Sequence, residues 1–107
     1  MNYFHQISQI PEKEIIKGFH GKMLHLEGFT IAYWRIEKGS ILPEHSHVHE
    51  QLSQVMTGEF EMTVSGETQV CKLGKVVTIP SHAVHSGRAL TDCTIIDVFQ
   101  PVREDYR

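Results

Sequence analysis

Apolar and polar residues alternate along most of this chain. From residue 22 to residue 100 the alternation has a period of two, breaks at Gly, Pro and Asp, and never sustains a period of 3.6. Successive strand side chains point to opposite faces, so the pattern predicts half-buried strands. We expect strands near residues 22–26, 29–37, 45–48, 51–56, 59–64, 67–72, 76–79, 84–89 and 93–99. Many short strands at close spacing are typical of a sandwich or a small barrel.

The first 20 residues are less regular. Either Pro11 opens a short helical turn that runs through Glu14, or the stretch forms an edge strand lying on a partner subunit, and the pattern leaves both open. At this length we expect a single domain over residues 1–107. Its barrel core would cover about 22–100, with 1–20 as an N-terminal extension or edge strand.

Composition supports a β fold and narrows the class of partner. There are 26 Val, Ile and Thr residues against 3 Ala and 6 Leu, and β-branched side chains favour sheets. A net charge of −3 argues against a nucleic-acid partner. No apolar run is long enough for a membrane span, and the opening lacks a signal peptide, so we expect a cytoplasmic protein without a membrane partner. Cys71 and Cys93 lie in expected strands and should be reduced, buried thiols.

Histidine is unusually frequent, with 8 residues, five of them between positions 45 and 85. His45, His47, His49 and Gln51 share one parity, so on a strand they project from one face, about 6.6 Å apart. Two adjacent imidazoles can converge on one ion, but three in a flat row cannot. Gln51 reaches such an ion only if the chain bends between residues 48 and 50, so we predict a bulge or strand switch there.

The other histidines have different expected roles. His49 is better suited to support a ligand or to face a substrate than to bind the metal. His85 follows a second turn signal at Pro80, and barrel closure could bring it opposite the His45 and His47 pair. A face of polar side chains is costly to bury unless something binds it. Ordinary hydrogen-bonded or exposed roles are expected for His5, His20 and His25.

Two spaced motifs resemble those of the cupin superfamily. The first is Gly39-x5-His45-x-His47-x3-Gln51-x6-Gly58, and the second is Gly74-x5-Pro80-x-His82-x2-His85. The chain departs from the usual pattern with Gln51 in place of Glu, His82 in place of Gly and Ala89 where Asn is common. The resemblance covers roughly residues 18–106. It implies an all-β, antiparallel jelly-roll barrel (a double-stranded β-helix) of six to eight strands with little or no helix.

The resemblance also implies one divalent transition metal as cofactor. Its ligands would be His45, His47, Gln51 and His85. Three neutral imidazoles and a neutral amide leave the ion its full charge, which makes a stronger Lewis acid and a less natural iron dioxygenase centre. Such a donor set suits Zn²⁺, Ni²⁺, Mn²⁺, Fe²⁺ or Cu²⁺.

A narrower resemblance points to pectin-degradation cupins of the KdgF type. It rests on residues 45–51, on the hairpin 58–67 and on the ending Asp97-Val-Phe99-Gln-Pro101-Val-Arg103-Glu104-Asp105-Tyr106. It implies conversion of 4,5-unsaturated monouronates, released from pectin or alginate, to linear keto sugars. Asp97 and Arg103 would be the catalytic residues, with Arg103 also binding the substrate carboxylate and Phe99 and His49 contacting the substrate. The partner would thus be a small anionic sugar, and small cupins of this kind commonly form homodimers.

The residues alone are less decisive about these roles. Asp97 shares a strand face with Ile95 and Phe99, yet by itself an Asp there would be expected at a solvent-facing edge. Arg103 would by default be an exposed tail charge, although its planar fork suits a carboxylate. Trp34 is expected to be an ordinary core residue. Alternative functions are a cupin dioxygenase or isomerase acting on another small substrate, and a non-catalytic metal-binding or ligand-binding cupin.

Overall fold

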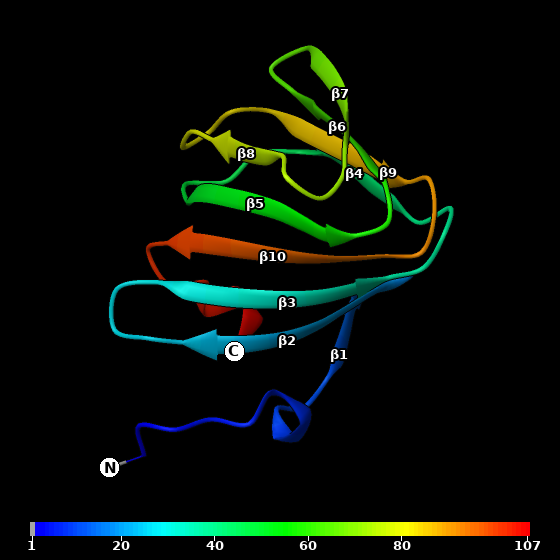
Figure 1. Cartoon of the computed structure of the whole chain (residues 1–107). Coiled ribbons are helices and arrows are strands. Elements are labelled where there is room, and N and C mark those ends of the chain that lie inside the picture. Colours follow the sequence, from blue (N-terminus) through cyan, green and yellow to red (C-terminus); the bar gives the residue numbers. More distant parts are fainter. Residues whose placement is uncertain (1) are drawn as a thin grey trace.

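The computed structural model describes residues 2–107 and is built almost entirely of antiparallel strands in two facing sheets (Figure 1). The larger sheet has the strand order β1 (Lys13–Ile16), β2 (Phe19–His25), β3 (Thr30–Ile36), β10 (Cys93–Gln100), β5 (Glu50–Thr57) and β8 (Val76–Ile79). The smaller sheet has the order β4 (Ile41–His45), β9 (His85–Ala89), β6 (Phe60–Val64) and β7 (Glu67–Cys71). This confirms the predicted all-β jelly-roll architecture, although residues 2–107 form ten strands where six to eight were expected.

The N-terminal stretch joins the larger sheet of its own chain. Strand β1 pairs with β2 at the sheet edge, so Pro11 precedes a strand and does not open a helical turn through Glu14. The two short 3₁₀ turns are η1 (Ile7–Gln9) and η2 (Glu104–Tyr106). Within residues 2–107, no helix has the length and apolar character needed to cross a membrane.

The predicted strand over residues 45–48 is wrong in position. Strand β4 begins at Ile41 and ends at His45, where it pairs with β9. Pro43 is accommodated because β4 is an edge strand, where a missing N–H costs no ladder hydrogen bond. The chain then crosses to the other sheet and resumes at Glu50 as β5, which confirms the predicted strand switch.

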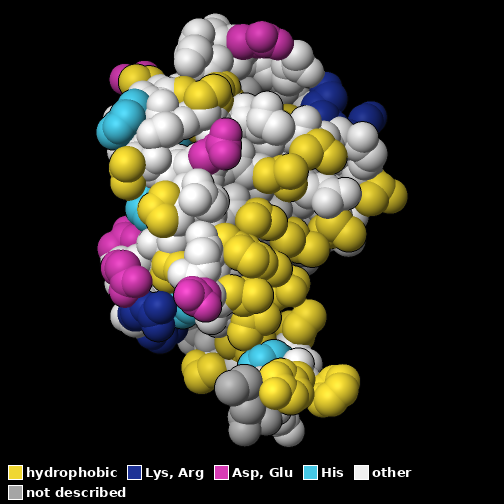
Figure 2. Space-filling model, turned by 90° about the vertical axis from the view of Figure 1, so that its left-hand side faces the viewer, with side chains coloured by type: hydrophobic (Ala, Val, Ile, Leu, Met, Phe, Trp, Pro, Cys, Tyr) yellow, Lys and Arg dark blue, Asp and Glu magenta, His cyan; other side chains and the backbone are white. Residues whose placement is uncertain are grey.

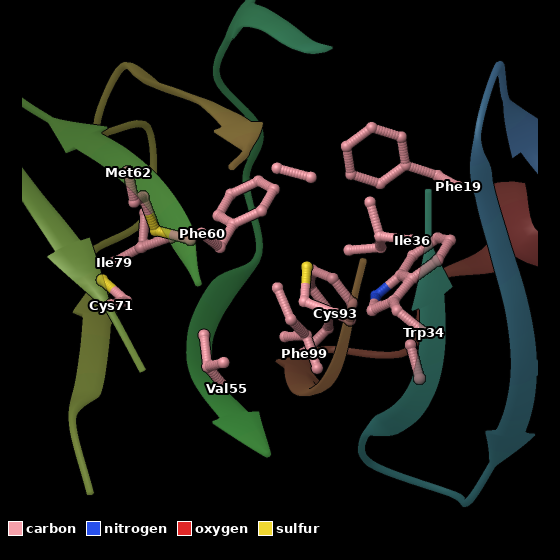
Figure 3. Packing of buried hydrophobic residues seen from close by; sticks show 13 residues of the cluster. Phe19, Trp34, Ile36, Val55, Phe60, Met62, Cys71, Ile79, Cys93 and Phe99 are labelled. Carbon is pink, nitrogen blue, oxygen red and sulfur yellow. The ribbon is translucent and has the colours of Figure 1, made fainter. Parts of the chain in front are cut away.

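The core lies between the sheets and takes side chains from both (Figure 3). Phe19 of the larger sheet meets Phe60 of the smaller one edge to face, with ring centroids 6.2 Å apart. Cys71 and Cys93 are buried and free, as expected.

Two motif positions have backbone reasons for their residues. Gly58 has φ +78°, and a Cβ there would lie 2.2 Å from the carbonyl oxygen of Asp92, so a side chain does not fit. His82 adopts φ +66°, which explains why the motif usually has Gly at this place.

Candidate functional site

Three histidines meet at the centre of the barrel. His45 ends β4 and stands directly opposite His85 at the start of β9, with ring centroids 4.1 Å apart. His47 lies on the connection between the sheets, 4.8 Å from the ring of His85 and 5.6 Å from that of His45. One nitrogen from each ring lies within 4.8 Å of the others, a spacing that fits a shared metal ion.

Backbone carbonyls fix the tautomer of all three rings. The Nδ1 atoms of His45, His47 and His85 lie 2.7, 2.9 and 2.9 Å from the carbonyl oxygens of Pro43, His49 and Ala83, respectively. Because a carbonyl oxygen only accepts, each Nδ1 carries the hydrogen and each Nε2 keeps a free lone pair. A carbonyl behind each ring is the usual support of a metal-binding histidine.

Burial favours the neutral form of His47 and His85. Desolvation lowers the pKa of His85 to about 4, and it also lowers the pKa of His47. A histidine must be neutral to bind a metal, so the protein provides the required protonation state near pH 7.

Gln51 completes the donor set from the opposite sheet. It is the second residue of β5, is buried, and places Oε1 3.1 Å from Nε2 of His47. With Nδ1 of His47 donating elsewhere, both of these atoms present lone pairs, and a cation between them would satisfy both. The residues present therefore fit a divalent metal with four neutral donors.

Asp97 lies inside the barrel on β10 and is buried. Its Oδ2 accepts a hydrogen bond of 2.9 Å from the indole nitrogen of Trp34, whereas Oδ1 is buried without a partner. Desolvation raises the pKa of Asp97 to about 6, an effect that Ser53, Gln51 and Trp34 partly offset. A carboxyl group that titrates near neutral pH is suited to moving protons.

Arg103 is buried as well, although it lies beyond the last strand. Its guanidinium carbon lies 4.6 Å from the ring centroid of Phe99 and 3.9 Å from that of Tyr106. Asp105 forms an ion pair with it, at 2.8 Å between Nη2 and Oδ2. Arg103 and Phe99 both line the cavity described below.

His49 and His82 lie away from the three-histidine centre. His49 packs behind His47 and against Phe99, with Nε2 3.3 Å from the carbonyl oxygen of Val102 and with Nδ1 buried and unpartnered. It does not line the cavity, so the geometry favours the supporting role over direct substrate contact. His82 is exposed on the turn before β9.

A cavity of about 290 Å³ connects these groups. Its polar end is formed by His45, His47, His85, Gln51, Asp97 and Arg103. Ser53 also lines it, and most of the remainder is apolar, including Ile15 and Ile16 of β1. The volume is at the small end for ligand sites, which suits a molecule the size of a monosaccharide.

Two residues of this site were not predicted from the sequence. Trp34 is buried in the core, as expected, but its N–H also donates to Asp97 and orients it. Nothing in the sequence indicated this polar contact, because the residue that pairs with Trp34 across the strands is the apolar Ile95. Tyr106 packs on Trp34, with centroids 6.0 Å apart, because the C-terminal turn folds back over the barrel.

Two kinds of comparison identify relatives. The chain is 32% identical over 71 residues to the pectin degradation protein KdgF of Dickeya dadantii (strain 3937). That match spans 64% of each protein, which is less than two thirds of either. An RmlC-like cupin from Shewanella frigidimarina NCIMB 400 has a similar structure, with TM-score 0.93, 30% identity, and coverage of 100% of this chain and 97% of that one. The structure of KdgF from Halomonas sp. gives TM-score 0.91 at 26% identity, covering 97% of this chain and 99% of that one.

The sequence model of the Cupin domain matches residues 32–99. This range contains His45, His47, Gln51, His85 and Asp97, so the domain match includes most of the site. Together with the jelly-roll topology, this match shows that the chain belongs to the cupin domain family.

Proposed function

We propose that this chain is a metal-dependent cupin enzyme that converts 4,5-unsaturated monouronates from pectin or alginate breakdown into linear keto sugars. The observation that carries the proposal is the unpartnered, buried Oδ1 of Asp97 in the cavity that the three histidines and Arg103 also line. The similarity to KdgF proteins supports the substrate class.

One divalent transition metal would be held by His45, His47, Gln51 and His85. When bound, it supplies a Lewis acid that polarises a substrate oxygen. The four neutral donors are compatible with Zn²⁺, Ni²⁺, Mn²⁺, Fe²⁺ or Cu²⁺.

Arg103 orients the substrate in this proposal. Its planar guanidinium binds the uronate carboxylate, and Phe99 supports both the guanidinium and the sugar. Holding the ring at one end fixes the reacting carbons relative to Asp97, which lowers the entropy cost of the proton transfer.

Asp97 moves the proton. The hemiacetal hydroxyl on C1 loses its proton as the bond between C1 and the ring oxygen breaks, which produces the aldehyde. Carbon C4 gains a proton and the ring oxygen becomes the C5 ketone, so the reaction is an isomerisation with no other reactant. Asp97, with a pKa of about 6, accepts the first proton and returns one to C4.

An anaerobic assay tests this function. Unsaturated monouronate is added to the metal-loaded protein, and its conjugated ultraviolet absorbance is followed while the aldehyde product is measured. Loss of absorbance with stoichiometric aldehyde supports the proposal. In a parallel aerobic assay, oxygen consumption on a different substrate would indicate a dioxygenase. Retained metal without turnover would indicate a binding protein. Either result rejects the proposed reaction.

We further propose that the chain acts as a homodimer in the cytoplasm. The outer face of the larger sheet carries adjacent apolar residues, because Val98 pairs with Ile31 and Leu52 while Ile96 pairs with Tyr33. Figure 2 shows hydrophobic side chains gathered in a connected area that extends toward the N-terminal segment, where Tyr3 and Phe4 are exposed. Contact with a second copy would cover these residues. Sedimentation of Val98→Lys as a monomer, where the wild-type chain sediments as a dimer, would support the homodimer.

A further inference from the structure

The guanidinium of Arg103 is enclosed on three sides. Phe99 and Tyr106 both pack against it, at 4.6 and 3.9 Å from the guanidinium carbon, with their rings at 87° to each other. Asp105 occupies one edge, with Nε to Oδ1 at 3.0 Å and Nη2 to Oδ2 at 2.8 Å. The arginine backbone is fixed as well, because its N–H donates to Oγ1 of the buried Thr30 at 3.0 Å.

The two partners of this ion pair differ in exposure. The side chain of Arg103 is 8% exposed, whereas that of Asp105 is 58% exposed. Asp105 therefore holds the guanidinium from the solvent side. The Nη1 group takes no part in this ion pair, and Arg103 lines the cavity.

We propose that Asp105 is a positioning residue for carboxylate recognition: by fixing the Nε–Nη2 edge of Arg103 from outside, it aims the Nη1 end at an anionic ligand in the cavity. This inference rests on the proposed function, since it concerns the group that would bind the uronate carboxylate.

Asp105 could instead act as an internal competitor that occupies the arginine fork. The geometry argues against competition because Asp105 is largely exposed, so water screens its charge from the cavity. It also belongs to the η2 turn, in which the N–H of Tyr106 donates to the carbonyl of Arg103 at 3.0 Å, so the carboxylate is placed by local backbone structure. Removing Asp105 should therefore disorder the guanidinium of Arg103 and weaken ligand binding, instead of releasing donors that strengthen it.

Binding of D-glucuronate and D-glucose to the purified full chain tests this role. The two sugars differ only in carboxylate against hydroxymethyl, and fluorescence of Trp34, the single tryptophan, reports on the cavity that it lines. Asp105→Ala should weaken glucuronate binding about fivefold, the scale of a lost exposed ion pair, with glucose binding unchanged. Asp105→Asn, which keeps one acceptor oxygen, should give an intermediate loss. The matched control is Glu104→Gln, since Glu104 lies in the same turn but pairs with Arg107.

The outcomes separate this inference from the proposed reaction. Loss of glucuronate preference in Asp105→Ala alone supports positioning, even if the wild-type chain turns over no unsaturated uronate; with turnover, KM should rise about fivefold at nearly constant kcat. An unchanged or stronger glucuronate preference in Asp105→Ala overturns the inference, and so does a wild-type chain that does not distinguish the two sugars. Unchanged glucose binding shows that the variant is folded.

Discussion

Two clusters of polar side chains on this small barrel differ in whether their polar atoms have partners. The inner cluster lies between the sheets and consists of His45, His47, Gln51, His85 and Asp97. The outer cluster lies at the edge of the larger sheet and consists of Glu12, Glu14, His20, Arg35 and Glu37. Each contains one histidine-based group whose ligand atoms are close enough to surround a cation.

In the outer cluster the charges satisfy one another. His20 places Nε2 2.6 Å from a carboxylate oxygen of Glu37 and 3.6 Å from one of Glu14. Arg35 donates to Glu12 at 2.8 Å, and this hydrogen bond lowers the pKa of Glu12. Because solvent reaches these carboxylates, the cluster needs no ion.

The inner cluster has lone pairs without matching donors. Each imidazole donates its only hydrogen to a carbonyl, and Oδ1 of Asp97 has no partner. Buried polar atoms of this kind are costly, so the comparison teaches that unsatisfied burial, more than histidine proximity, marks the functional site.

The largest effect expected is on bound metal. His47→Ala should remove most of the divalent metal that copurifies with the wild-type chain, because it deletes one of four donors and the bridge to Gln51. Elemental analysis of the purified protein measures this. His20→Ala is the control and should retain full metal content; loss of metal from it instead would assign the ion to the outer cluster.

The next effect is on rate. Asp97→Ala should lower turnover of unsaturated monouronate by about 10²- to 10⁴-fold, because the proton carrier is removed. Its metal content should stay at the wild-type level, since Asp97 is not among the residues grouped around the ion. A variant that loses metal and activity together would contradict the role proposed for this carboxyl.

A smaller effect concerns stability and pH. Burial raises the pKa of Asp97 from 3.8 to about 6, so the folded state binds its proton more tightly than the unfolded state does. The cost of ionising it grows as pH rises through this window and is complete above it. In metal-free protein, the stabilisation gained by Asp97→Asn should therefore be greater at pH 8 than at pH 5, by about 1 kcal/mol, in urea unfolding. An equal gain at both pH values would show that Asp97 titrates normally.

The smallest effect is expected at the outer cluster. Glu37→Gln should shift the melting temperature by about 2 °C or less, and high salt should reduce that shift further, because exposed pairs are screened. A larger, salt-independent shift would mean that the outer cluster is more buried in solution than its geometry indicates.

The sequence predicted the parts of the site that lie in short, regular segments. The parity of His45 and His47 and the long distance from them to Gln51 predicted a bulge or a strand switch, and β4 and β5 do belong to different sheets. The position of β4 was missed: the strand was expected to begin at residue 45, after Pro43, whereas it runs from Ile41 to His45 as an edge strand that tolerates the proline.

Contacts that depend on long-range closure were not predictable from spacing. Burial of Arg103 arises from a tail that folds back onto Thr30, 73 residues earlier in the chain. The bond from Trp34 to Asp97 joins residues 63 positions apart on neighbouring strands, and no local pattern encodes it. The roles of His49, Phe99 and Arg103 in substrate binding stay predictions.

The strand switch after His45 has a mechanical consequence. The donors come from both sheets, with His45 and His85 on the smaller one, Gln51 on the larger one and His47 on the segment between them. A cation held by all four would cross-link the two sheets, so the sheets could separate on unfolding only if the cation were released. Resistance to heat would then follow the free concentration of the ion, and chelation would weaken the scaffold as well as stop the chemistry.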